Sequence, residues 1–329
     1  MDTLHVTETT WRGLPAWRIA GRERTAVVTA IGGHLAAFTD LAATLNPLWE
    51  PTWPAADPAT VRPGPACTWG DGPEASLLAG IAGSNLCIPI FGGPPAGSGL
   101  PVHGDAGVSR WTRADAPADA FIATLRTPQS GLAIERRLRL DGQTLELSTS
   151  VRHERSGAYD LDWCEHTTLG GAFLDGAEID AGIDAAWTPD HDPLPGDIRR
   201  FAGRLQRIAP AQALALPASG DPPVGDVLAG RVTAGRWQAR NQRLGWVLDA
   251  RWDPSEFPWL TLWTQHRERS GPPWNGRERT RGMELSTRPF PEPRSYAGAD
   301  GGFQGRPVLC RIPAGTAVTK TLQLRWSRI

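Results

Sequence analysis

Lysine is nearly absent from this chain of 329 residues: of its 34 lysine and arginine residues, only Lys320 is a lysine. Pyridoxal-phosphate enzymes form a Schiff base with a lysine, and P-loop nucleotide hydrolases bind phosphate with the lysine of a Gly-Lys-Ser/Thr loop. Lys320 lies in a strand-like run, residues 317–326, and no glycine precedes it. The sequence therefore argues against both enzyme classes.

An excess of either charge is also missing. The chain has 34 basic and 35 acidic residues, for a net charge of -1. Proteins that bind nucleic acid or anionic membranes by charge carry a basic surface, so neither is expected as a partner. No run approaches the roughly 20 apolar residues of a membrane span, and the N-terminus lacks the apolar segment of a signal peptide. We therefore expect a cytoplasmic location.

Common sequence motifs of metal, redox and hydrolytic sites are absent too. The four cysteines, at positions 67, 87, 164 and 310, have none of the spacings of zinc or redox sites. HExxH, GxSxG and a GxGxxG after a strand do not occur. These absences argue against metal hydrolases, serine hydrolases and dinucleotide-binding enzymes. We also expect no metal site.

Long helices are not expected, because glycine (37) and proline (30) make up about a fifth of the chain. Asp141-Gly142 separates two runs of alternating residues and predicts a hairpin. Length alone allows one or two domains. We predict an all-β fold: a large antiparallel β-sandwich that forms a single domain over residues 1–329. Alternating or β-branched runs predict strands at 16–20, 25–30, 34–39, 121–126, 132–140, 144–151, 236–239, 244–250, 259–265 and 318–326.

Three segments have the composition of long loops: 45–83, 91–100 and 266–282. The first is rich in proline, and long loops of this kind often line a site. The third is rich in arginine and is interpreted either as a mobile connection or as a lid over a substrate. The 15 tryptophans exceed the 10 other aromatic residues, and indole faces suit both a core and a sugar ring.

His103 is the first candidate site residue. It precedes Gly104, Asp105 and Gly107 in a predicted turn, which can aim the ring into a cleft. The alternative is a histidine that only caps the turn through a local hydrogen bond.

His166 is the second candidate. Alternation along a strand puts it on one polar face with Asp162 and Thr168, while Glu165 points to the other face. Because an imidazole titrates near neutral pH, it can act as a general acid or base. A histidine with a purely structural role inside the sandwich fits equally well.

Glu284 is the third candidate. Alternation places it with Gly282 and Ser286, two small residues that leave room for a ligand, and opposite Met283 and Leu285. A carboxylate there can serve as a base or pair with a neighbouring arginine.

In their order and spacing, several short segments resemble the aldose 1-epimerase, or galactose mutarotase-like, superfamily, in particular a bacterial branch of it. The likeness covers nearly the whole chain and depends on the joint order of the segments. They are Ile31-Gly32-Gly33-His34-Leu35, Asn46-Pro47-Leu48-Trp49, Ser84-Asn85-Leu86-Cys87-Ile88-Pro89-Ile90-Phe91-Gly92, Val102-His103-Gly104-Asp105, Trp163-Cys164-Glu165-His166-Thr167-Thr168-Leu169-Gly170 and Gly282-Met283-Glu284-Leu285.

The resemblance implies a β-sandwich enzyme that interconverts sugar anomers without a cofactor. It implies that Glu284 removes the proton of the C1 hydroxyl, that His166 protonates the ring oxygen, and that His103 holds or polarises this oxygen. A small-molecule sugar is then the expected partner.

The resemblance also suggests residues that contact the substrate: Asn85, Asp105, Trp263 and Gln265. Trp163, Trp259 and Trp274, like Trp263, are candidates either for stacking on a sugar or for the core. The family's Asn-Arg pair is replaced by Asn85-Leu86, and the family's hydroxyl-binding acid has no clear counterpart, so the sugar is not identified. Arginines within 267–281 raise the hypothesis of a phosphorylated or acidic sugar.

Two other functions remain open at this point. One is a carbohydrate-binding or regulatory protein that has the sandwich without turnover. The other is a carbohydrate hydrolase or lyase, since a retaining glycosidase needs two carboxylates about 5 Å apart and Asp105, Asp162 and Glu165 are available as the second. The sequence contains no indication of the oligomeric state.

Overall fold

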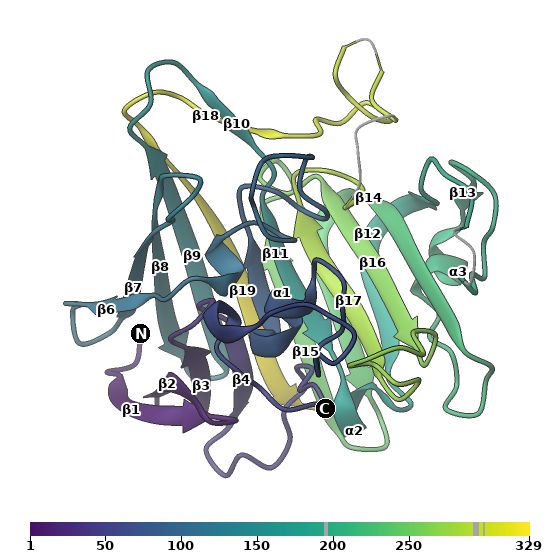
Figure 1. Cartoon of the computed structure of the whole chain (residues 1–329). Coiled ribbons are helices and arrows are strands. Elements are labelled where there is room, and N and C mark those ends of the chain that lie inside the picture. The colour runs from purple at the N-terminus through teal and green to yellow at the C-terminus, as the bar shows by residue number, and fades with distance from the viewer. Residues whose placement is uncertain (194–196, 292–295, 299) are drawn as a thin grey trace.

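The computed structural model describes residues 1–193, 197–291, 296–298 and 300–329. All but two of the strands pair antiparallel in one network of 17 strands (Figure 1). No helix in the described ranges exceeds six residues. These observations confirm the all-β antiparallel sandwich.

One half of the network contains six strands. In order of pairing they are β6 (Thr112–Ala114), β7 (Phe121–Arg126), β8 (Leu132–Asp141), β9 (Thr144–His153), β19 (Ala317–Arg328) and β15 (Trp246–Trp252). Asp141 pairs with Thr144, so the predicted hairpin is confirmed with Gly142 and Gln143 as its two-residue loop.

The other half contains the remaining strands of the network. In order of pairing they are β14 (Val224–Asn241), β16 (Trp259–His266), β17 (Arg279–Ser286), β11 (Cys164–Leu169), β5 (Ser84–Cys87), β4 (Leu35–Asp40), β3 (Arg24–Thr29), β2 (Leu14–Ala20) and β1 (His5–Trp11), with β12 (Glu178–Trp187) and β13 (Arg207–Ile208) beyond β14.

The long strand β14 joins the two halves. Its first part, from Val224 to Arg231, pairs with β16, and its last part, from Arg236 to Asn241, pairs with β15. Side chains from both halves, among them Leu138 of β8 and Leu285 of β17, form one large core. The strands are held in register by this shared core, because a shift by one residue would turn every apolar side chain outward.

The short elements lie outside the network. β10 (Tyr159–Leu161) pairs with β18 (Cys310–Ile312). The helices are η1 (Pro58–Thr60), α1 (Ala75–Gly80), η2 (Ala106–Val108), α2 (Gly171–Leu174) and α3 (Pro210–Leu214). No helix in the described part of the chain is long and apolar enough to cross a membrane.

Two of the predicted loops differ from the structure. The segment 45–83 is not loop throughout, because α1 forms where Leu77 and Leu78 can be buried. The loop predicted at 266–282 ends earlier, since β17 begins at Arg279. Residues 279–282 pair with the neighbouring strands, so β17 extends into this arginine-rich stretch.

Candidate active site

Three of the predicted site residues, His166, Glu284 and Asn85, lie in one row across three neighbouring strands. His166 of β11 is paired with Glu284 of β17 on one side and with Asn85 of β5 on the other. Directly paired residues of an antiparallel sheet project to the same face. The predicted faces are therefore confirmed: His166 and Glu284 share one face, while Glu165 and Leu285, which also pair, share the other.

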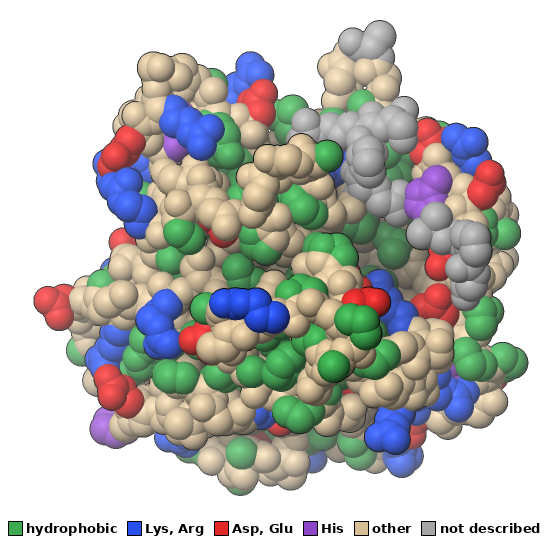
Figure 2. Space-filling view, viewed as in Figure 1, with side chains coloured by type: hydrophobic (Ala, Val, Ile, Leu, Met, Phe, Trp, Pro, Cys, Tyr) green, Lys and Arg blue, Asp and Glu red, His purple; other side chains and the backbone are tan. Residues whose placement is uncertain are grey.

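A cavity of about 350 Å³ covers this row, and its walls include His103, His166 and Glu284. Helix α1 lies in front of the strands in Figure 1, and Leu77 of this helix forms part of the wall. Phe91 comes from the second predicted loop, and all three predicted loops contribute wall residues. Figure 2 shows this face hollowed to the right of its centre, with acidic and basic side chains along the rim.

The central contact of the cavity joins His166 and Glu284. Nε2 of His166 is 3.2 Å from Oε1 of Glu284, and both side chains are almost fully buried. The contact is not aligned as a hydrogen bond, and Oε1 has no hydrogen-bond partner among the described residues. The other ring nitrogen, Nδ1, is 3.1 Å from the hydroxyl of Thr168. The ring is thus held from one side, while the carboxyl group keeps an unused acceptor.

Gly282 provides the space for the carboxyl group. A Cβ atom at this position would lie 2.2 Å from Oε1 of Glu284 and 2.9 Å from Cβ of Trp263. Any larger residue would displace the carboxyl group from its place beside the imidazole.

Burial shifts the pKa values of the pair in opposite directions. It raises the pKa of Glu284 well above the ordinary carboxyl value, although the positive charge of Arg281 opposes the shift. It lowers the pKa of His166 to about 4. Both shifts have the same cause, since a group removed from water loses the solvation of its charged form. In the free protein burial therefore favours the uncharged forms, a protonated Glu284 and a neutral His166.

His103 faces the same cavity from a turn. Its backbone has a φ of 64°, and the N–H of Gly92 donates a hydrogen bond of 3.0 Å to its Nδ1. Because Nδ1 is the acceptor, the neutral ring carries its proton on Nε2. Burial, His166 and Arg269 all lower the pKa of His103, so this neutral form is favoured. The ring lies 5.4 Å from that of His166, centroid to centroid.

Tryptophans form another part of the cavity wall. The ring of Trp263 is 5.9 Å from that of His166, and Trp274 stacks on Trp49 at 5.7 Å. Trp274 and Trp263 both line the cavity. Trp49 donates to Glu278 (2.8 Å), and the same carboxylate accepts from the backbone of Thr52 at 3.1 Å. Glu278 thus ties the loop containing Trp274 to the segment 45–83.

The four predicted substrate contacts have different locations. Trp263 lines the cavity. Gln265 lines a second cavity beside it. Asn85 is next to His166 in the sheet but is not on the cavity wall; its Oδ1 has no hydrogen-bond partner in the described ranges. Asp105 is a correction: its carboxylate accepts three hydrogen bonds from Gln129 and Ser130, so it holds a turn together instead of facing the site.

The other two candidate carboxylates are also used elsewhere. Glu165 points into the core, where Arg136 lies at 3.0 Å and Thr149 donates at 2.9 Å. Asp162 forms an ion pair of 2.6 Å with Arg288. Neither lines the cavity, so neither can act with Glu284 as the carboxylate pair of a retaining glycosidase.

The remaining tryptophan candidates belong to the core, where Trp163 and Trp259 are both fully buried. One functional candidate was missed from the sequence: Glu74, whose side chain lines the cavity. It precedes α1 in a proline-rich segment without periodicity, which gave no signal for it.

Only one of the arginines at 267–281 reaches the cavity. Arg269 lines it and lies over the ring of Trp274 at 5.0 Å. Arg281 is fully buried on the other face of β17, and Arg279 pairs with Asp175. The cavity wall thus carries one guanidinium group and two carboxyl groups, those of Glu74 and Glu284. In the described part of the chain, no group of three or more His, Cys, Asp or Glu residues could hold a metal ion.

Comparison with known proteins gives matches in structure but not in sequence. No family model and no curated protein sequence matches the chain. A galactose mutarotase-like protein from Clostridium acetobutylicum is similar, with a TM-score of 0.65, 12% identity and coverage of 100% of this chain and 99% of the other. A galactose mutarotase related enzyme from Lactobacillus acidophilus has a TM-score of 0.61, 14% identity and coverage of 95% and 97%.

A galactose mutarotase-like protein from Lactobacillus casei gives a TM-score of 0.59 at 13% identity, with coverage of 95% of this chain and 100% of the other. Sequences this different do not carry an activity from one protein to another, but the likeness covers both chains from end to end. The chain has the galactose mutarotase-like fold.

Proposed function

We propose that the protein is a cofactor-independent aldose 1-epimerase, which interconverts the anomers of a free aldose or a close derivative. The observation that carries the proposal is the contact of 3.2 Å between Nε2 of His166 and Oε1 of Glu284 inside a cavity that His103 also faces. An acid and a base at this distance can serve two neighbouring oxygens of one sugar ring.

Ring opening of a hemiacetal exchanges two protons on adjacent oxygens. Glu284 takes the proton of the C1 hydroxyl, and the C1–O1 bond becomes a carbonyl. The C1–O5 bond breaks, its electron pair stays on O5, and His166 gives O5 a proton. Rotation about C1–C2 turns the other face of the carbonyl to O5, and closure by the reverse transfers gives the opposite anomer.

The reactive form of Glu284 and His166 arises by transfer of one proton within the pair. Transfer of this proton from Glu284 to His166 makes a carboxylate base and an imidazolium acid without any exchange with solvent. Burial disfavours these charges in the free protein, and the hydroxyl groups of a bound sugar replace part of the lost solvation. Opening leaves the proton on Glu284 and a neutral His166, and closing by the reverse transfers restores the carboxylate and the imidazolium. A complete cycle thus leaves the pair unchanged, so no cofactor is required by the balance of protons.

His103 is proposed to position the ring oxygen. With Nδ1 occupied by Gly92, its Nε2–H is left as a donor toward the cavity. A donor fixed in this way stabilises the negative charge that develops on O5 before the proton arrives.

The experiment is anomer exchange followed by polarimetry or NMR on freshly dissolved α-glucose, α-galactose and α-xylose. We expect the protein to accelerate exchange of at least one of them above the spontaneous rate. A binding or regulatory protein on this fold would instead show calorimetric sugar binding with no acceleration. A hydrolase or lyase would release a new reducing end or an unsaturated product from an oligosaccharide.

A further inference from the structure

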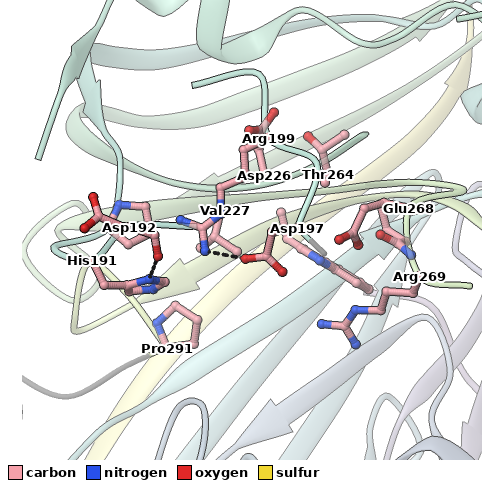
Figure 3. Close-up of a pocket in the computed structure, with 14 residues that line it drawn as sticks. His191, Asp192, Asp197, Arg199, Asp226, Val227, Thr264, Glu268, Arg269 and Pro291 are labelled. Atoms are coloured by element: carbon pink, nitrogen blue, oxygen red, sulfur yellow. Dashed lines mark hydrogen bonds and ion pairs between the residues drawn. The ribbon is translucent and has the colours of Figure 1, made fainter. Parts of the chain in front are cut away.

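A second cavity, of about 580 Å³, adjoins the first and has no role in the ring-opening chemistry. The two cavities share Val227, Trp263, Arg269 and Pro291 as wall residues. They are therefore neighbouring chambers of one site. Figure 3 shows the second chamber.

Both chambers lie on the same face of the sheet. Trp263 of β16 pairs with Gly282 of β17 on one side and with Val227 of β14 on the other, so all three share the face of Glu284. Gly225 and Gln265 pair two residues further along the same two strands and continue this face. From β11 to β14 the floor crosses three strand spacings, about 14 Å in total. One pyranose ring is too short to span this distance.

The second chamber is lined by planar polar groups. In the amide orientation that satisfies both partners, Gln265 donates to Glu268 at 3.2 Å and accepts from the backbone N–H of Arg269 at 2.9 Å. Asp197 forms an ion pair of 2.9 Å with Arg199. In Figure 3, Glu268 and Arg269 lie at one side of the chamber, away from His191 and Asp192. Amides, carboxylates and guanidinium groups of this kind are the usual partners of sugar hydroxyls.

The charges of this chamber argue for a neutral ligand. Asp197 is neutralised by Arg199, and the buried Asp226 by Arg200. Glu268 is a further carboxyl group of this wall, and burial raises its pKa. A phosphate or carboxylate would find Arg269 as a cation but also the carboxyl group of Glu268 beside it.

Gly225 keeps the floor of the second chamber open. A Cβ atom there would lie 3.0 Å from Oε2 of Glu268, the movable end of a flexible side chain. A larger side chain at this position would therefore fold with the strand and occupy the chamber.

We propose that the second chamber binds a further sugar ring joined to the one that reacts, so that the substrate is a reducing disaccharide or longer oligosaccharide. This inference rests on the proposed function for the reducing ring at His166 and Glu284. The second ring would lie over Gly225 and Val227 against Trp263, with its hydroxyls bound by Gln265 and Glu268.

The test compares maltose with glucose for wild type and Gly225→Val. We expect both sugars to be epimerised, and the variant to lower kcat/KM for maltose by about tenfold or more, because the valine side chain occupies the place of the second ring. For glucose, kcat/KM should stay within about twofold. Ala234→Val, an exposed position on the same strand, is the matched control and should change neither value.

Two results would overturn the second chamber while the proposed function stands: an equal loss for glucose and maltose, or no loss for maltose. If wild type epimerises neither sugar, the proposed function fails. Calorimetry with maltose then tests separately whether the second chamber binds a sugar. Maltose binding that Gly225→Val weakens supports it, and no binding, or binding that the variant leaves unchanged, overturns it.

Discussion

Strands β11 and β17 carry buried polar side chains on both faces, and the two faces differ in how these groups are partnered. On the core face, Glu165 has Arg136 and Thr149 as partners. On the cavity face, Oε1 of Glu284 and Oδ1 of Asn85 have no hydrogen-bond partner among the described residues. Both faces are equally buried, so burial alone does not distinguish them. Glu165 and its partners therefore stabilise the fold, whereas the unused acceptor of Glu284, which lines the cavity, is available to a ligand.

Glu284→Gln should have the largest effect on activity. Loss of the base should lower kcat/KM for anomer exchange by about 10²- to 10⁴-fold. Because Oε1 of Glu284 has no hydrogen bond to lose, the free energy of unfolding should change little. Polarimetry and urea denaturation measure the two quantities. Intact acceleration would show that Glu284 is not the base.

Glu165→Gln makes the same change on the opposite face and should have the opposite outcome. Arg136 would be left as a buried charge without its ion-pair partner, which costs about 3–5 kcal/mol of stability. Urea denaturation measures the loss. Replacing both residues by Arg136→Met and Glu165→Leu should restore most of it, and failure of this rescue would contradict the assignment of the pair as structural.

His103→Phe should have a smaller effect than loss of the base. The substitution retains the stacking on Phe91, 5.6 Å away, but removes the donor at Nε2. We expect kcat for anomer exchange to fall by about 10²-fold, the usual cost of one lost donor to a developing charge. His103→Gln, which retains an N–H donor, should recover part of the rate. Equal rates for both variants would leave His103 without the proposed role.

The pH profile of kcat/KM tests whether burial controls the protonation of the His166–Glu284 pair. Below the pKa of His166, about 4, both members of the pair are protonated and no base remains. The acidic limb should therefore lie near pH 4, and the alkaline limb above the ordinary carboxyl range, where Glu284 loses the shared proton. An acidic limb near 6.5, the ordinary histidine value, would show that burial does not control the pair.

The sandwich was predictable because most of its strands alternate clearly. Among the strands that were not predicted are β12, in which exposed acidic residues do alternate with apolar ones around Gly182, and β1, which is rich in threonine. Asp184 and Asp180 of β12 are paired with Arg231 and Arg236 of β14, and no sequence pattern shows such a partner 47 or more residues away. Strand β12 forms because it pairs with β14, which is distant in sequence, and a local pattern does not show this pairing.

The site was predictable residue by residue but not as an assembly. Alternation gave the faces of His166 and Glu284, while their contact depends on the register of β11 against β17. The turn around His103 suggested that its ring is held, and the structure shows Gly92 as the donor. The prediction that Asp105 contacts the substrate did not foresee its hydrogen bonds to Gln129 and Ser130. These residues lie more than 20 positions away, and nothing local in the sequence indicates the contact.

The sharing of β14 between the two halves has a practical consequence. A cut within this strand would leave each fragment with an unpaired edge and an exposed apolar surface. We therefore expect neither half to be obtainable as a stable fragment, so that transplanting the proposed site to another scaffold requires the complete sandwich.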